Sequence, residues 1–298
     1  MTQSIDIRNL SKRYGKSSVL ALDSLNLHVE AGQVYGFLGA NGAGKSTTIR
    51  LLLNFIQPSS GSAFIVDNDV VKQSVTARQH IGYLAGDVAL WPKVTGNELF
   101  DYMLKLHRVD DRDYLHELIK RFEAEPEKRI DELSKGNRQK IGVIQAFMHK
   151  PDVLILDEPT SGLDPLMQEV FYKTVREASE WGAAVFVSSH NLAEAQRMCD
   201  VVGIIKHGKL IHEQVITDDK VLGVPAFRVV LATPAEIGKI KESKSLKVLS
   251  EDGTVVTVQP TGKISDMLGL LSKVNVQSLT TQQINLEDEF LEYYGDGA

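Results

Sequence analysis

The sequence has a single cysteine, Cys199, among its 298 residues, and it has no excess of basic residues. One thiol forms no internal disulfide and makes no zinc site by itself, so we expect a protein of a reducing compartment. The formal net charge is −6. Proteins that bind nucleic acid or anionic membrane surfaces through their charge are basic, so we expect no nucleic acid as a partner.

Long apolar runs are also missing. The purest runs, residues 153–156 and 201–205, are far shorter than the roughly 18 residues that span a bilayer. The N-terminal stretch has no basic segment followed by an apolar one, so we expect no signal peptide. If the protein serves a membrane process, another chain must therefore supply the membrane-spanning part.

The remaining composition, with 43% hydrophobic and 24% charged residues, is typical of a globular protein with a sizeable core. In residues 1–218, short aliphatic runs alternate with amphipathic segments, which indicates an α/β domain with a mostly parallel sheet. Residues 90–150 are poor in strands, and Thr95 and Glu98 have the spacing of a capping box, which indicates a helical insertion. The predicted strands are 34–38, 153–156, 183–188, 201–205 and 210–212, and the predicted helix after the first strand is 47–55.

Residues 222–298 are predicted to form a second, smaller α+β domain. Their order of strand, helix, strand, strand, helix and strand is a split βαβ arrangement, as in ferredoxin-like domains. This part has no catalytic constellation, so we expect a dimer-stabilising or regulatory accessory domain, with a sensor of a small ligand as the alternative. The predicted strands are 227–231, 246–250, 255–258 and 276–279, and the predicted helices are 234–242, 264–271 and 286–294.

Residues 39–46 carry the strongest chemical signal in the chain. They read Gly-Ala-Asn-Gly-Ala-Gly-Lys-Ser, fit the pattern G-x-x-x-x-G-K-[ST], and lie between a predicted strand and a predicted helix. Glycines let successive backbone N–H groups face a phosphate, and a helix N-terminus adds partial positive charge. The Lys45 ammonium can then reach the outer phosphates, and the Ser46 hydroxyl can ligate Mg²⁺. The residues predicted to contact the nucleotide here are Gly39, Asn41, Gly42, Ala43, Gly44, Lys45, Ser46 and Thr47.

Two carboxylates follow the apolar strand 153–156. Ligands of open α/β sheets bind at the carboxyl ends of the strands, which is where this spacing places Asp157 and Glu158. We expect Asp157 to hold Mg²⁺, directly or through water, and Glu158 to orient or deprotonate the attacking water. Two acids could equally begin an ordinary turn, and it is the phosphate loop that favours the site.

With these elements in place, the segment Leu133-Ser-Lys-Gly-Asn completes a pattern that resembles the ATP-binding-cassette (ABC) family. Residues 157–164 are similar to the family's Walker B motif and D-loop, and residues 188–190 to its switch histidine. The resemblance covers roughly residues 3–215, with the motifs in the family's order. It implies a P-loop NTPase cassette with a mostly parallel core sheet, an N-terminal antiparallel part and a helical insertion, and an ATPase that uses ATP and Mg²⁺.

The resemblance also implies roles for residues outside the phosphate loop. Ser134 and Gly136 would cap the ATP bound to a second subunit, so that two copies would sandwich two ATP molecules head to tail. His190 would contact the γ-phosphate and hold Glu158 and the water in line. The remaining two assignments are Asp164, which would cross the dimer interface, and Tyr14, which matches the aromatic that stacks on adenine, although a tyrosine there could equally be ordinary core.

The sequence departs from the family's pattern in two places. The signature motif has Lys135 and Asn137 where the family has glycine and glutamine. The glutamine expected after the segment 81–85 is replaced by Gly86, followed by Asp87. Asp87 is the candidate to take over the contact with magnesium or water.

Three segments, residues 34–41, 134–140 and 286–292, resemble the stand-alone subunits of the exporter-like ABC-2 type class. That resemblance implies a homodimer bound peripherally, at the cytoplasmic face of the membrane, to a separate integral membrane permease that exports a drug, lipid or polysaccharide. One alternative is a soluble ABC ATPase acting on ribosomes or DNA, which the single phosphate loop, the acidic charge and the lack of heptads disfavour. The other is a module that senses ATP without hydrolysing it, which Glu158 and His190 disfavour.

Overall fold

The computed structural model describes residues 3–15, 19–216, 226–241, 243 and 245–282. The chain divides into two compact units, Met1–Ile216 and Thr217–Ala298, which are described separately. The predicted helix over 286–294 lies outside the described residues. Within the described part of the chain, no helix is long and apolar enough to cross a membrane.

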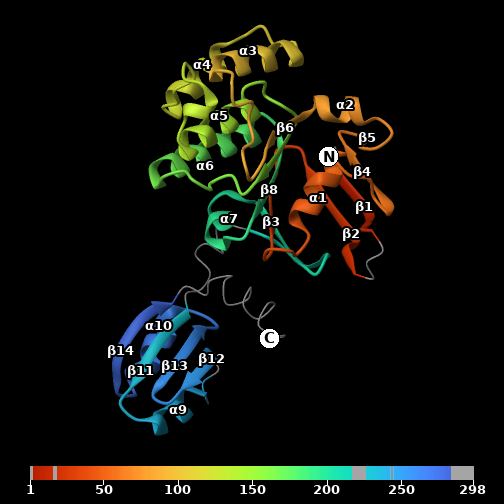
Figure 1. Ribbon diagram of the computed structural model, residues 1–298. Helices are drawn as coiled ribbons and strands as arrows, with labels where there is room; N and C mark the ends of the chain where they lie inside the picture. Colours follow the sequence, from red (N-terminus) through yellow and green to blue (C-terminus); the bar gives the residue numbers. More distant parts are fainter. Residues whose placement is uncertain (1–2, 16–18, 217–225, 242, 244, 283–298) are drawn as a thin grey trace. The chain divides into compact units, whose positions relative to one another are not determined.

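A six-stranded sheet forms the centre of the first unit, in the order β10-β9-β3-β8-β7-β6 (Figure 1). Every pair of neighbours is parallel except the hairpin of β9 and β10. Because helices and a second sheet cover it, β3 and β8 are buried along their whole length. The strands are β3 (Val34–Leu38), β6 (Ile81–Leu84), β7 (Val153–Asp157), β8 (Ala184–Ser189), β9 (Val201–Lys206) and β10 (Lys209–Val215).

An antiparallel sheet in the order β2-β1-β4-β5 flanks this central sheet, with β1 and β2 before β3 in the chain and β4 and β5 after it. One hydrophobic core joins the two sheets, since Ile5 and Leu22 of the antiparallel sheet pack in the same cluster as Phe37 and Phe186 of the parallel one. Helix α1 (Lys45–Leu52) begins two residues earlier and ends three residues earlier than predicted. The other elements here are β1 (Gln3–Arg13), β2 (Leu20–Glu30), β4 (Ser60–Ile65), β5 (Asn68–Asp69) and α2 (Ser74–Gln79).

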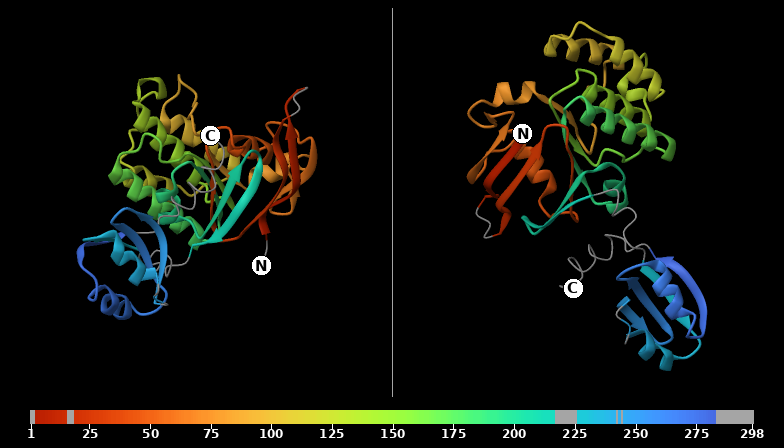
Figure 2. Two further views of the ribbon diagram at one scale, coloured as in Figure 1. Left: turned by 90° about the horizontal axis from the view of Figure 1, so that it is seen from below. Right: turned by 180° about the vertical axis from the view of Figure 1, so that it is seen from behind.

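Helices fill the chain between β6 and β7. They gather on the side of the unit away from the N-terminal strands, as the views in Figures 1 and 2 both show. The capping box at the start of this segment is formed, with the Glu98 N–H donating to Thr95 Oγ1 at 3.2 Å and the Thr95 N–H donating to Glu98 Oε2 at 2.8 Å. The helices are α3 (Gly96–His107), α4 (Asp113–Arg121), the 3₁₀ turn Ile130–Glu132 and α5 (Lys135–Phe147), followed after β7 by α6 (Pro165–Glu180) and α7 (Leu192–Met198).

The second unit is a four-stranded antiparallel sheet in the order β12-β13-β11-β14. This order, with one helix after β11 and one after β13, confirms the ferredoxin-like arrangement. Its core packs Val229, Val256 and Val258 of the sheet against Ile240 and Met267 of the helices. The elements are β11 (Ala226–Leu231), the 3₁₀ turn Pro234–Glu236, α9 (Ile237–Lys241), β12 (Leu246–Asp252), β13 (Val255–Pro260), α10 (Ile264–Leu271) and β14 (Val276–Gln282).

Candidate nucleotide-binding site

The loop between β3 and α1 requires its glycines. Gly42 and Gly44 have φ of 82° and 123°, in the region that L side chains rarely adopt. A Cβ at Gly39 would lie 2.7 Å from the Ile205 carbonyl oxygen, so no larger residue fits there. Gly44 provides no side-chain cap for α1. The first N–H groups of the helix therefore remain available to an anion.

A cavity of ≈ 350 Å³ opens at this loop. It lies at the carboxyl ends of β3, β6 and β7, the edge at which open α/β sheets bind ligands. It brings together predicted residues from three distant segments, the phosphate loop, the turn at Asp87 and the pair Asp157 and Glu158. The lining consists of Ala21, Ala40, Asn41, Gly42, Gly44, Lys45, Ser46, Thr47, Gly86, Asp87, Asp157 and Glu158.

Gly39 and Ala43 belong to the same loop but do not line the cavity. Ala43 is buried, and its N–H donates to the Ala40 carbonyl at 3.1 Å. The Gly39 carbonyl accepts from Lys45 Nζ at 2.5 Å. Both residues thus make contacts within the loop and do not face the cavity. Their contact with the nucleotide stays a prediction.

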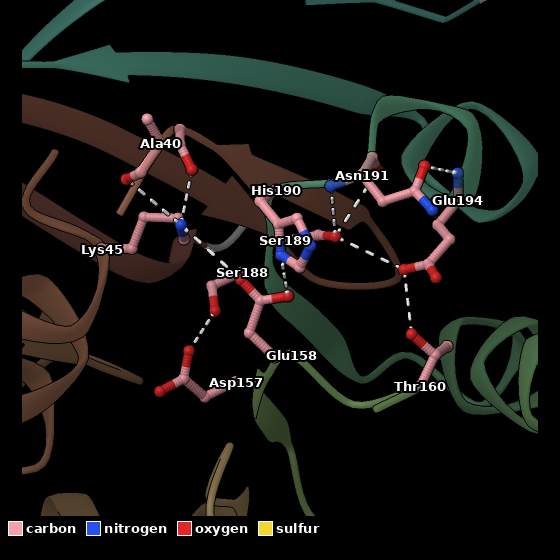
Figure 3. A network of polar contacts seen from close by, with 11 residues as sticks. Ala40, Lys45, Asp157, Glu158, Thr160, Ser188, Ser189, His190, Asn191 and Glu194 are labelled. Carbon is pink, nitrogen blue, oxygen red and sulfur yellow. Dashed lines mark hydrogen bonds and ion pairs between the residues drawn. The ribbon is translucent and has the colours of Figure 1, made fainter. Parts of the chain in front are cut away.

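Lys45 carries its ammonium group into the site. The residue is buried, and Nζ lies 3.4 Å from the Ala40 carbonyl oxygen and 3.6 Å from Glu158 Oε1 (Figure 3). The carbonyl oxygens of Gly39 and Ala40 and the Glu158 carboxylate thus hold the Lys45 side chain at the cavity, where a bound anion could reach it. This position suits contact with the outer phosphates of a nucleotide.

Asp157 is held by a hydroxyl of the neighbouring strand. The buried Ser188 hydroxyl, on the adjacent strand β8, donates to Asp157 Oδ1. Gly86 lies close to the same carboxylate, since a Cβ built there would be 3.5 Å from Asp157 Oδ2. The nearby phenol of Tyr83, on β6, has its pKa raised by burial and then by the negative charge of Asp157. Ser188 belongs to the segment 188–190 that resembles the switch-histidine motif. The sequence alone assigns it no role, because only the pairing of β7 with β8 reveals its partner.

Glu158 and His190 meet at the ends of β7 and β8. The His190 Nδ1 atom lies 2.7 Å from Glu158 Oε2 (Figure 3). Glu158 has a φ of 45°, and its N–H donates to the Ser188 carbonyl at 3.1 Å. The fold thereby brings together the two residues to which the sequence assigned hydrolysis, although the roles themselves stay predictions.

The residues predicted to act on a second subunit's nucleotide do not line this cavity. Ser134 caps α5 and accepts from the Asn137 N–H at 3.2 Å. Asp164 caps α6 and accepts from two backbone N–H groups, each at 3.0 Å. Gly136 lies against the loop before α6, where a Cβ would be 3.0 Å from the Gly162 carbonyl oxygen.

The remaining assignment, Tyr14, and one departure from the signature motif, Asn137, both lie outside the cavity lining. Tyr14 is 44% exposed, with its hydroxyl 3.4 Å from Thr47 Oγ1, so it lies near the cavity rather than in the core. The Asn137 amide donates to Glu125 Oε2 at 2.7 Å. This residue, where the sequence departs from the signature motif, therefore links the start of α5 to the chain that precedes it.

The oxygen donors of the cavity fit Mg²⁺. Ser46 and Asp157 both line it, and hydroxyl and carboxylate oxygens are ligands that this hard cation prefers. Among the described residues, no group of three or more His, Cys, Asp and Glu side chains could hold a metal ion. Ser46 and Asp157 are therefore the side chains that would hold Mg²⁺, which binds proteins through few side chains and usually keeps several waters.

Comparison with known proteins assigns this site to a family. The family model "ABC transporter" matches residues 22–161. The bacitracin transport ATP-binding protein BcrA of Bacillus licheniformis is 35% identical over 216 residues, covering 72% of this chain and 70% of BcrA. The probable multidrug ABC transporter ATP-binding protein YbhF of Escherichia coli is 35% identical over 212 residues, but the chain covers only 36% of YbhF. The uncharacterized ABC transporter ATP-binding protein YhcH of Bacillus subtilis is 31% identical and matches 98% of this chain.

Solved structures show the same cassette. An ATP-binding subunit of an ABC transporter superposes with a TM-score of 0.66 at 28% identity, covering 72% of this chain and 91% of that one. The dimeric bacterial ABC transporter cassette MJ0796 has a TM-score of 0.65 at 23% identity, again over 72% of this chain and 99% of that one, which shows the fold alone. The chain belongs to the family of ABC transporter ATP-binding proteins, which are ATPases. The predicted family and cassette fold are confirmed.

Proposed function

We propose that the chain is the ATP-hydrolysing subunit of an ABC transporter whose permease is a separate polypeptide. The observation that carries the proposal is the Glu158–His190 contact of 2.7 Å beside the phosphate loop. A carboxylate oriented by an imidazole, next to a buried lysine, provides what the attack of water on a phosphate requires. That attack depends on positioning and on stabilisation of charge.

In this proposal the loop N–H groups and Lys45 bind the β- and γ-phosphates. Glu158 orients the attacking water and accepts its proton, while His190 keeps the Glu158 carboxylate in place. Ser46 and Asp157 would hold Mg²⁺, which when bound neutralises charge on the phosphate oxygens. Tyr14, whose hydroxyl lies 3.4 Å from Thr47 Oγ1, would stack on the adenine base.

Two predicted site residues that do not line the cavity, Ser134 and Asp164, support a dimer. Ser134 is exposed at the N-terminus of the 13-residue helix α5, where an anion is favoured. Because its own cavity does not include it, we infer that it meets the ATP of a second copy. Asp164 would cross the same interface, and the structural neighbour MJ0796 is itself dimeric. Loss of the γ-phosphate contacts on hydrolysis would let the halves open.

The names of two relatives support a proposal about the kind of transport. BcrA is named for bacitracin and YbhF for multidrug transport. We infer that this chain drives export of a drug-like, lipid or polysaccharide substrate from the cytoplasmic face of a membrane. The permease would select the substrate.

The test of hydrolysis uses the purified chain with Mg²⁺ and ATP. Glu158→Gln keeps the ATP affinity and lowers kcat roughly hundredfold or more, because only proton transfer and the orientation of water are lost. Lys45→Ala loses ATP affinity instead, and the surface variant Glu169→Gln serves as the matched control. Turnover by Glu158→Gln at the normal rate would refute its role, and unchanged ATP affinity in Lys45→Ala would refute the assignment of the phosphate loop.

The test of partnership is a mild-detergent purification of the tagged Glu158→Gln chain from its native membranes with ATP present. A stoichiometric protein with several membrane spans supports the transporter. Ribosomes in place of a membrane protein would favour the soluble ATPase.

A further inference from the structure

The turn that carries Glu158 is strained. Its φ of 45° lies in the left-handed region, where a residue with a Cβ is disfavoured. Such a conformation persists only where the surrounding contacts hold it. The contacts around the turn therefore determine whether Glu158 keeps this conformation.

Two of the holding contacts come from the backbone and from helix α5. The turn closes on itself, with the Ser161 N–H donating to the Glu158 carbonyl at 3.2 Å. The Gln139 amide, buried in α5, donates to the Pro159 carbonyl at 2.7 Å. These contacts fix the backbone of the turn from one side.

A single carboxylate oxygen holds the other side. Thr160 is 6% exposed, and its hydroxyl donates to Glu194 Oε2, on α7, at 2.9 Å. The hydroxyl of Ser189, which is 1% exposed, lies 3.4 Å from the same oxygen. Ser189 directly precedes His190. Glu194 thus bridges the turn that carries Glu158 and the turn that carries His190, as Figure 3 shows.

An acidic side chain in the first turn of a helix is common, because it interacts favourably with the partial positive charge of the helix N-terminus. Glu194 does occupy that place, and the Asn191 side chain caps its N–H at 3.3 Å. A dipole contact, however, needs no partner from another segment. Here the buried Thr160 hydroxyl donates to the carboxylate, and the buried Ser189 hydroxyl, which also accepts from the Asn191 N–H at 2.9 Å, lies 3.4 Å from the same oxygen. Without Glu194 the Thr160 hydroxyl would lose its acceptor, and an unpaired buried hydroxyl is costly.

We propose that Glu194 is a positioning residue for ATP hydrolysis. It does not line the nucleotide cavity, so it acts through Thr160 and Ser189. Its carboxylate keeps the two turns at the separation at which Glu158 and His190 are 2.7 Å apart. The inference rests on the proposed roles of Glu158 and His190.

The test measures kcat and ATP affinity separately in Glu194→Ala, Thr160→Val and the double variant. A hydrogen bond to a charged group is lost in each, so kcat falls roughly ten- to hundredfold while the ATP affinity stays within about twofold. The double variant is no slower than the slower single variant, because both remove the same link. Thr160→Ser, which keeps the hydroxyl, restores the rate. Glu169→Ala, an acid paired with Arg197 on the surface, is the matched control and leaves kcat unchanged.

Two outcomes would overturn the inference. One is a normal kcat at saturating ATP in both single variants while Glu158→Gln abolishes hydrolysis, which leaves the proposed function intact. The other is a parallel loss of ATP affinity and thermal midpoint with no separate effect on kcat, which means that Glu194 only supports the fold. If Glu158→Gln itself hydrolyses normally, the proposed function fails, and the positioning role fails with it.

Discussion

At the scale of the residue, Gly86 and Asp87 occupy the turn where the sequence departs from the family's glutamine, and both line the cavity. A Cβ at position 86 would lie 3.3 Å from the Asp157 carbonyl oxygen and 3.5 Å from its carboxylate carbon. A side chain at this position would therefore begin next to Asp157. The next residue, Asp87, also lines the cavity. We therefore expect Asp87 to act on Mg²⁺ or its water shell.

Asp87→Asn tests that expectation. Removing one negative charge near the cation weakens its binding, and outer ligands contribute roughly ten- to hundredfold to metal affinity. The Mg²⁺ concentration that gives half-maximal ATP binding should rise roughly tenfold. Nucleotide affinity measured over a Mg²⁺ titration checks this, with the exposed Asp110→Asn as control. Identical titrations for Asp87→Asn and the unsubstituted chain would exclude Asp87 from the metal site.

At the scale of the element, the ends of helices α3 and α5 meet through two histidines. The rings of His107 and His149 stack with centroids 3.8 Å apart. Burial, and then the neighbouring His107, lowers the pKa of His149 from 6.5 to about 4. The fold therefore favours the neutral imidazole at this contact.

The stability of the first unit should consequently depend on pH. The unfolded chain protonates His149 near pH 6.5, whereas the folded chain does so only near pH 4. Stability that is fully present above pH 6.5 is thus lost as the pH falls towards 4. Urea unfolding at pH 7.5 and 5 should show a loss of roughly 2 kcal/mol from this group. In His149→Gln the free energy of unfolding should no longer show this loss between pH 7.5 and 5. In the control His116→Gln, which changes an exposed histidine, the loss should persist.

The elements also show where sequence patterns suffice. Strands 34–38 and 153–156 could be predicted because both faces of a parallel sheet are buried and their side chains are nearly all apolar. Strand β6 was missed, since it has four residues and includes Gly82 and the half-buried Tyr83. The link from Thr160 to Glu194 could not be predicted, because it joins residues 34 positions apart whose types are common in helices and turns.

At the scale of the whole molecule, the first unit holds the nucleotide cavity, and the match to YhcH extends over the second unit as well. BcrA matches only 72% of the chain. We propose that residues 222–298 stabilise the dimer or regulate it. The alternative is a sensor of a small ligand, although no motif in residues 222–298 points to a particular ligand.

Ser134→Asp tests the dimer. Aspartate caps a helix as well as serine does, so α5 should remain stable. The new negative charge, however, would face the γ-phosphate of the partner's ATP. We expect Ser134→Asp to bind ATP normally as a monomer and to lose the ATP-dependent dimer that Glu158→Gln forms. Ser134→Asn, which caps without a charge, should still dimerise. Size-exclusion chromatography with light scattering, performed in the Glu158→Gln background, distinguishes these outcomes, and an ATP-dependent dimer of Ser134→Asp would contradict the model of shared sites.

Because of the left-handed backbone at Glu158, the residue that is best for ATP hydrolysis and the residue that is best for thermal stability should differ at this position. Glycine adopts a φ of 45° without the penalty that a Cβ brings, which is about 1–2 kcal/mol. Glu158→Gly should therefore melt at a higher temperature than the unsubstituted chain while it no longer turns over ATP. A search for thermostable variants of this protein, carried out without an activity screen, would select against the residue proposed to hydrolyse ATP.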